Sequence, residues 1–243
     1  NGSILIALKP YTANLWATSS SGTQISSFSV SNGTYQTGPN NIFAASFPGT
    51  TTGGTTTAAL GRTDLPTQPT GYFYWLPNTS GNGGVVEIFG ATYIGGTPTR
   101  LGSFDLNAGS GNSLGFVRLG MGPDGTGWIL AGDGSTLYLG KFATNALNPV
   151  TVISVPVVIS GGSASTFQNG DLCLSGTNTI YALANDGSGV TQIFQGSASN
   201  PTVTLTKRWD VVDGSNNPFT GSVNGVAFDA QGSLYLSTAS GLY

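Results

Sequence analysis

The 243-residue sequence contains no histidine, a single cysteine and few charged residues, which make up only 7% of the chain. Without histidine, a Ser-His-Asp or Cys-His catalytic arrangement cannot form, and neither can a zinc site with a histidine ligand. Cys173 cannot form an internal disulfide, and its position between two leucines predicts a small buried side chain rather than a reactive thiol. These absences exclude several common classes of hydrolase.

The scarcity of charge also limits the partners. Seven basic residues are scattered among ten acidic ones, for a formal net charge of −3, so no basic patch is available to bind nucleic acid. No apolar run approaches the roughly 20 residues of a membrane-spanning helix, and we expect no membrane insertion. Asn1 is neither an initiator methionine nor the start of a signal peptide, so we expect a processed or excerpted chain.

The residues that are abundant predict a folded β protein. Hydrophobic residues account for 38% of the chain and aromatic residues for 10%, and they occur in short alternating runs separated by the 38 glycines and other turn-forming residues. No segment of helical length has an apolar stripe at 3.6-residue spacing, so we expect essentially no helix.

One stretch serves as the template for the rest of the chain. Residues 226–228 predict a short apolar strand, Asp229 and Gly232 frame a tight turn, and residues 234–236 predict a second strand. Glycine accepts a positive φ at no steric cost, and an aspartate side chain can hydrogen-bond the backbone amides of a turn. The stretch therefore predicts a β-hairpin.

Related patterns occur upstream at nearly constant spacing. The anchor residues of the second strands are 58, 56, 51 and 54 residues apart, and they are Leu15, Phe73, Ile129, Ile180 and Leu234. In one upstream copy, Asp124 and Gly127 correspond to Asp229 and Gly232. Such a steady period indicates a repeat architecture.

About four strands in roughly 50 residues, repeated in tandem, predict the blades of a β-propeller. We expect one array of five units, the last partial, at about residues 3–38, 58–106, 113–160, 161–213 and 223–243. Residues 39–57 break the rhythm, and we expect an irregular Thr/Gly-rich insertion whose segment 48–57 projects from the array. The apolar run 150–159 is expected to close the third unit, with Pro156 at an edge or a bulge.

The repeated order of an apolar strand, Asp-x-x-Gly and aliphatic-Tyr-aliphatic resembles the blades of bacterial extracellular and cell-surface β-propeller proteins. The match is best over residues 226–236, followed by 172–183 and 121–131, whereas the first two units lack the Asp-x-x-Gly turn. The resemblance implies an all-β propeller of four-stranded antiparallel blades. It implies no single function, because functionally unrelated families share this blade.

Two other all-β architectures remain open. A β-solenoid would suit the abundance of Gly, Ser, Thr and Asn, although its coils usually repeat every 20–30 residues or so. An immunoglobulin-type sandwich would explain the strands but not the recurrence of the motif. The spacing favours the propeller.

Aromatic side chains are the candidate binding groups. Those at the repeated strand positions are expected to pack between sheets, and they are Trp16, Trp128, Tyr181 and Tyr235. The run from Tyr72 to Trp75 differs, because it places aromatic rings on both faces of one strand. We therefore predict a contact surface at Tyr72, Tyr74 and Trp75.

Carboxylates are the remaining candidates for catalysis. Glycoside cleavage requires two of them across one cleft, and the chain offers only Glu87 and its aspartates. Four aspartates stand in turn-like positions beside Gly or Pro, namely Asp64, Asp133, Asp186 and Asp213. Asp124 and Asp229 are expected to cap the repeated turn. A calcium ion at Asp124 or Asp133 would require more carboxylates than these loops carry. We therefore expect no cofactor.

The hypothesis from the sequence is a non-enzymatic secreted or cell-surface propeller module for adhesion, assembly or scaffolding. Its expected location is extracellular, and its expected partners are other protein chains, the remainder of the same polypeptide, or glycans. The alternative is a propeller-type lyase or hydrolase that uses carboxylates or a metal at the central channel. Three Asn-x-Ser/Thr motifs are candidate glycosylation sites, at Asn1, Asn32 and Asn78.

The fifth unit reaches only its second strand and the start of a third at Tyr243, and two residues precede the first unit. We therefore expect that residues 1–243 do not close a propeller by themselves. Either the polypeptide continues or another chain donates the missing strands, because strands left at an open edge invite association.

Overall fold

The computed structural model shows an all-β chain, with no α-helix in the residues that it describes. These residues are 14–18, 24–29, 35–36, 42–43, 55–60, 72–77, 84–92, 99–107, 110–122, 126–143, 151–154, 157–162, 167, 171–175, 178–185, 188–197, 202–221, 223–228, 234–238 and 241–242. Before residue 84, only the backbone of the strands is described. The expected absence of helix holds throughout these ranges.

Strands β1 to β8 form the first two sheets. Sheet 1 contains β1 (Asn14–Thr18), β2 (Gln24–Ser29), β3 (Tyr35–Gln36) and β4 (Ile42–Phe43), and β2 pairs with each of the other three. Sheet 2 is a meander of β5 (Thr55–Leu60), β6 (Tyr72–Pro77), β7 (Val85–Thr92) and β8 (Thr99–Asp105). All of these pairs are antiparallel, as expected for strands joined in sequence.

Strands β9 to β20 form three more sheets. Sheet 3 is a meander of β9 (Phe116–Met121), β10 (Thr126–Gly132), β11 (Leu137–Ala143) and β12 (Thr151–Ser154). Sheet 4 contains β14 (Leu172–Ser175), β15 (Thr179–Asn185), β16 (Thr191–Ser197), β17 (Thr204–Asp210) and, at its outer edge, β13 (Val158–Ser160). Sheet 5 contains β18 (Val223–Phe228), β19 (Leu234–Thr238) and β20 (Gly241–Leu242).

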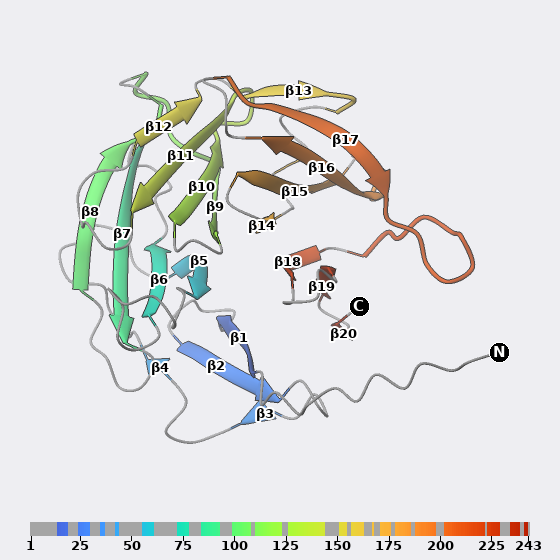
Figure 1. Ribbon diagram of the computed structural model, residues 1–243, viewed down its shortest axis with the longest axis horizontal. Helices are drawn as coiled ribbons and strands as arrows, with labels where there is room; N and C mark the ends of the chain where they lie inside the picture. Colours follow the sequence, from blue (N-terminus) through green and yellow to red (C-terminus); the bar gives the residue numbers. More distant parts are fainter. Residues whose placement is uncertain are drawn as a thin grey trace.

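The five sheets follow one another around a common centre (Figure 1). The strands nearest this centre form a continuous series, in which β1 contacts β5, β5 contacts β9, β9 contacts β14, and β14 contacts β18. In sheets 2 and 3, and from β14 to β17 in sheet 4, successive strands lie progressively farther out, and β13 lies outside β17 (Figure 1). Each of sheets 2, 3 and 4 therefore presents its two faces to its neighbours in the series.

The repeat in the sequence corresponds to a repeated position in the sheets. The five anchor residues lie on β1, β6, β10, β15 and β19, and the last four of these strands each pair with the strand that precedes them. The turns at Asp124 and Asp229, and residues 3–13 of the first expected unit, lie outside the described residues. The hairpins that these two turns would connect, β9–β10 and β18–β19, are both present.

The expectation of an irregular insertion at residues 39–57 is wrong in two places. Strand β4 lies within it and pairs with β2, and β5 begins at Thr55 and pairs with β6. Threonine is β-branched, so a Thr-rich segment without apolar residues can still form the edge strand of a sheet. Residues 44–54 lie outside the described residues.

The apolar run 150–159 does not form one closing strand. It is divided into β12, which ends sheet 3, and β13, which pairs in parallel with β17 and ends sheet 4. A proline has no amide proton to donate to a ladder, and both strands that flank Pro156 in the sequence are edge strands. The boundary expected between the third and fourth units therefore shifts to the N-terminal side of β13.

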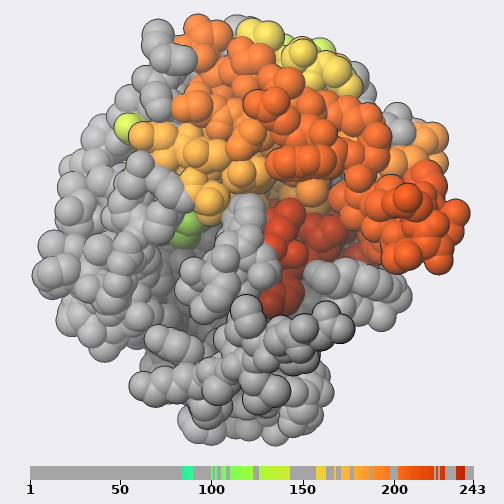
Figure 2. All heavy atoms as spheres, turned by 45° about the vertical axis from the view of Figure 1, so that its right-hand side comes forward, coloured from blue at the N-terminus to red at the C-terminus, as the bar shows by residue number. Residues whose placement is uncertain are grey.

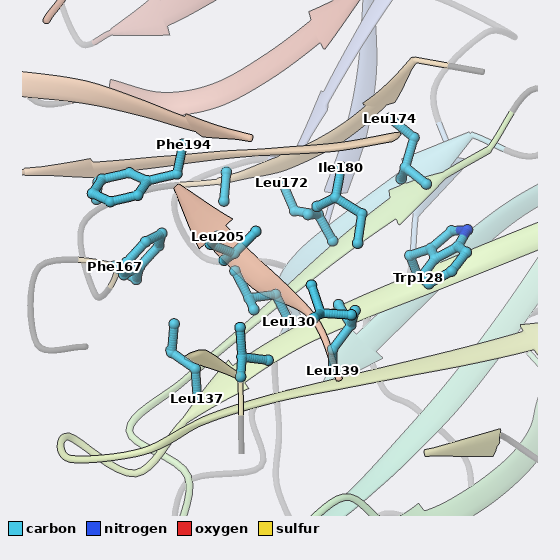
Figure 3. Close-up of a cluster of buried hydrophobic side chains, with 14 of the residues drawn as sticks. Trp128, Leu130, Leu137, Leu139, Phe167, Leu172, Leu174, Ile180, Phe194 and Leu205 are labelled. Carbon is cyan, nitrogen blue, oxygen red and sulfur yellow. The ribbon is translucent and has the colours of Figure 1, made fainter. Parts of the chain in front are cut away.

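The hydrophobic core lies between the sheets. Strand β10 illustrates the principle: Ile129 and Ala131 face a cluster shared with sheet 2, whereas Trp128 and Leu130 face a cluster shared with sheet 4. Side chains alternate between the faces of a strand, so a strand covered on both faces is almost continuously apolar. Figure 3 shows the cluster between sheets 3 and 4, where Leu130 and Leu139 meet Leu172 and Leu205.

Candidate binding site on the fourth sheet

The structure describes only part of the aromatic contact surface and none of the glycosylation sites predicted from the sequence. Tyr72, Tyr74 and Trp75 lie on β6, a central strand of sheet 2, and the positions of their side chains lie outside the description. Asn1, Asn32 and Asn78 also fall outside the described residues. The contact surface predicted on β6 therefore stays a prediction.

The prediction that repeated aromatic residues pack between sheets is confirmed for Trp128 and Tyr181. Trp128 is buried between sheets 3 and 4, beneath the ammonium group of Lys141, which lies 5.9 Å from its ring centroid. Tyr181 is partly buried between sheets 4 and 5. These rings are structural, and we do not assign them to a binding site.

Asp133 confirms the interpretation of an aspartate as a turn-forming residue. Its Oδ1 accepts hydrogen bonds from the amides of Ser135 and Thr136 at 3.0 and 2.8 Å, and its Oδ2 accepts one from the Tyr138 hydroxyl at 3.0 Å. Partial burial alone would raise the pKa of Asp133, but these hydrogen bonds hold it well below its usual range. Asp213 caps the 213–217 turn in the same way.

The other described carboxylates do not gather at one place. Glu87 lies on β7 and accepts a hydrogen bond from Arg100 of β8 at 2.7 Å, away from the central series of strands. Among the described residues, no group of three or more His, Cys, Asp or Glu side chains could hold a metal ion. Asp64, Asp124, Asp186 and Asp229 lie outside these residues.

Asp171 is the one described carboxylate beside the central strands. It immediately precedes β14, and its Oδ2 accepts a hydrogen bond of 2.8 Å from the amide of Val226 on β18. Arg118 on β9 interacts with it electrostatically. Asp171 therefore joins three consecutive sheets through groups on β9, β14 and β18.

Burial dominates the ionisation of this central group. It raises the pKa of Asp171 to about 6, although the amides of Leu172 and Val226 and the charge of Arg118 all act to lower it. Asp171 keeps some solvent exposure, yet it lies so deep among protein atoms that desolvation outweighs its hydrogen bonds. Cys173 is buried, as predicted, and burial, followed by the charge of Asp171, raises the pKa of its thiol.

The opposite situation occurs on β17, beyond the residues that pair with β13, where a large apolar side chain is exposed. Trp209 on β17 is 53% exposed, although its cross-strand partner Ile193 is buried against sheet 5. A β-bulge between the pairs formed by Ile193 and Phe194 adds Arg208 to β17 as an extra residue. Because of this bulge, Arg208 and Trp209 both lie on the face that points toward sheet 5.

A row of hydrogen-bonded polar side chains crosses the same face. The Gln195 amide donates to the Tyr181 hydroxyl at 2.9 Å, and its carbonyl oxygen accepts from Nε of Arg208 at 3.0 Å. The row runs over β15, β16 and β17, and Tyr181 and Gln195 are directly paired residues. We call Trp209, Arg208, Gln195 and Tyr181 the Trp209 face.

The chain continues from this face into a hairpin. The amide of Phe219 donates to the carbonyl of Val211, and Asn216 adopts a φ of 67° at the tip. Val211 and Phe219 pack against the cluster between sheets 4 and 5. Figure 2 shows residues 202–221, in orange, as a continuous part of the molecular surface.

Sequence reasoning missed the Trp209 face, although one signal was present. Lys207, Arg208, Asp210 and Asp213 form the densest run of charge in a chain that is only 7% charged. A tryptophan inside such a run is unusual for a core strand. The run did not reveal which face of β17 the ring would occupy, because that depends on the bulge.

The chain matches no protein-family model and no curated protein. Among solved structures it is similar to luciferin-regenerating enzyme, with 14% identity, a TM-score of 0.47, and coverage of 95% of this chain and 66% of that one. A lectin from Aleuria aurantia, in complex with α-methyl-L-fucoside, has 15% identity and a TM-score of 0.46, with coverage of 95% and 71%. A prolyl endopeptidase has 14% identity and a TM-score of 0.39, with coverage of 92% and 31%.

This chain thus spans just under two thirds of the length of luciferin-regenerating enzyme and less than a third of the prolyl endopeptidase. At these identities and TM-scores, the likenesses transfer neither an activity nor a ligand to it. Within the described residues, no helix is both long enough and apolar enough to cross a membrane.

Proposed function

We propose that this chain is a non-enzymatic, extracellular or cell-surface β-propeller module that binds a partner through the Trp209 face, in adhesion, assembly or scaffolding. The exposure of Trp209 beside a hydrogen-bonded polar row is the observation that carries the proposal. Tryptophan, tyrosine and arginine are the residues most enriched among those that dominate binding energies.

The arrangement of the sheets supports the propeller part of the proposal. Successive sheets contribute successive central strands, and each described interface between sheets 2 and 5 is filled by one apolar cluster. In a propeller, each four-stranded sheet is a blade and packs face to face with the next one. The nearly constant spacing of the anchor residues has the same explanation.

The composition supports a surface role. Charged residues are scarce, Gly, Ser, Thr and Asn are abundant, and no histidine is available for the commonest forms of acid–base catalysis. Exposing the large apolar surface of a tryptophan side chain to water is unfavourable. The presence of Trp209 on the surface of β17 therefore fits a contact with another molecule.

Binding and turnover can be separated by one set of measurements. Wild-type protein, Trp209→Ala and a control, Val158→Ser, would be applied to arrays of polysaccharides and extracellular proteins, and self-association would be measured by analytical ultracentrifugation. Val158 is exposed on the edge strand β13, so the control removes an apolar group elsewhere on the surface. We expect the wild type and the control to bind or self-associate and Trp209→Ala to lose this property. Turnover of a bound polymer by the wild-type monomer would contradict the proposal.

The second candidate function is a propeller-type lyase or hydrolase, and Asp171 is the observation that favours it. A carboxyl group whose pKa is raised to about 6 at the centre of the fold, beside an arginine, has the properties of a general acid. Assaying polysaccharide lyase and glycosidase substrates with the wild type and Asp171→Asn tests this alternative. Loss of a measurable activity in Asp171→Asn, with the fold retained, would favour it over the binding module.

A further inference from the structure

We propose that the Trp209 face binds a saccharide that carries a carboxylate, such as a uronic acid. This inference rests on the proposed function and deepens it by naming the class of ligand. It follows from the geometry and charge of the four side chains that form the face.

The indole ring of Trp209 supplies an apolar plane at the edge of the sheet. On the same face, the residue paired with it, Ile193, is buried between sheets 4 and 5, whereas Trp209 remains 53% exposed. A pyranose ring presents C–H groups on one side, and these carry the positive partial charge that the negative face of an aromatic ring attracts. Trp209 therefore suits one sugar ring stacked on the outer strand.

Arg208 is held in a fixed orientation beside this plane. Its Nε donates to Gln195, which is itself bonded to Tyr181, so the guanidinium is anchored from one side. In the part of the chain that the structure describes, its two Nη groups make no hydrogen bond. A planar guanidinium with both Nη groups available matches a carboxylate in a bidentate arrangement.

The charges around Arg208 favour an anionic ligand over a neutral one. Lys207 and Asp210 point to the other face of β17, where they form an ion pair of 2.7 Å, and Gln192 also donates to Asp210 at 3.2 Å. On strands β15 to β17, Arg208 is then the one charged side chain of the Trp209 face. A single carboxylate per sugar suits this one positive charge.

The ligand polarity can be tested with two matched probes, an oligogalacturonate and its fully methyl-esterified form, titrated calorimetrically at low and at physiological salt. The ester keeps the sugar ring but removes the charge. Wild type, Trp209→Ala, Arg208→Gln and the surface control Val158→Ser would be compared, each after its thermal unfolding temperature has been shown to match the wild type.

We expect the wild type and the control to bind the acid more tightly than the ester, with the preference weakening as salt increases. Trp209→Ala should bind both probes about tenfold more weakly or worse. Arg208→Gln should bind acid and ester equally. No saturable binding of the acid, or equal binding by the wild type and Trp209→Ala, would overturn the inference. If Trp209→Ala nevertheless abolishes binding to a protein or to a second copy of this chain, the proposed function stands and only the saccharide is rejected.

Discussion

Leu205 and Trp209 lie on opposite faces of strand β17, although a separation of four positions would place them on the same face of a regular strand. Leu205 is 1% exposed and packs against Leu172 and Phe194, between sheets 3 and 4 (Figure 3). Trp209 is paired with Ile193 on the side of sheet 5. The bulge at Arg208 shifts the alternation by one residue and thereby moves the tryptophan out of the core interface.

The two side chains should therefore differ sharply in their contribution to stability. Leu205→Ala removes a fully buried side chain, and we expect it to lower the free energy of unfolding by about 2–5 kcal/mol. Trp209→Ala should change it by no more than about 1 kcal/mol, because half of the ring is already in water. Urea denaturation of both variants measures the difference. Equal losses would show that Trp209 is a core residue.

Gly120 should be required for the approach of two central strands. A Cβ atom at this position of β9 would lie 2.9 Å from Leu174 Cδ1 and 3.1 Å from the carbonyl oxygen of Leu172, both on β14. We expect Gly120→Ala to destabilise the protein by about 1–3 kcal/mol, because one of these contacts involves rigid backbone. Gly115→Ala is the matched control, since its nearest neighbour would be 3.8 Å away and the fold should be retained or slightly stabilised. Thermal unfolding distinguishes the two, and a neutral Gly120→Ala would contradict the close packing of β9 and β14.

Asp171 should give the protein a stability that decreases as pH rises from about 4 to 6. Its pKa is raised from 3.8 to about 6 on folding, so in this window the folded state binds more protons than the unfolded state. The free energy of unfolding should fall by up to about 3 kcal/mol across the window and then remain constant. Asp171→Asn removes the titrating group and should abolish this slope, as measured by denaturation at several pH values. An unchanged slope in the variant would assign it to another group.

Asp133 should have the opposite pH dependence at lower pH. Its hydrogen bonds with Ser135, Thr136 and Tyr138 hold its pKa below that of an unfolded aspartate, so they stabilise the fold fully above about pH 4 and are lost as pH falls further. We expect Asp133→Ala to cost about 1–2 kcal/mol at neutral pH and less in acid. Asp133→Asn retains an acceptor for the two amides and should cost less than the alanine variant. A cost of Asp133→Ala that does not depend on pH would show that packing, and not the carboxylate, stabilises this turn.

The repeat, the strand content and the absence of helix could be predicted from the sequence because they depend on local alternation and on turn residues. Ile129 and Ile180 illustrate this, since their spacing alone placed both on the second strand of a sheet. Trp128 was correctly expected in the core for the same reason, because a strand covered on both faces has few polar residues. Asp133 followed from the preference of aspartate for turns.

Features that depend on register and on long-range contacts were decided by the tertiary structure. The parallel pairing of β13 with β17 joins residues 46 positions apart, and no local pattern encodes it. Burial in the folded protein raises the pKa of Asp171, although the amide of Val226, 55 residues later, and the charge of Arg118 from another sheet both act to lower it. The side of β17 on which Trp209 lies depends on one extra residue in that strand. A bulge of this kind changes the register without changing the composition of the strand. The sequence alone therefore determined the repeated strands, whereas the candidate binding site arises from how two neighbouring strands are paired.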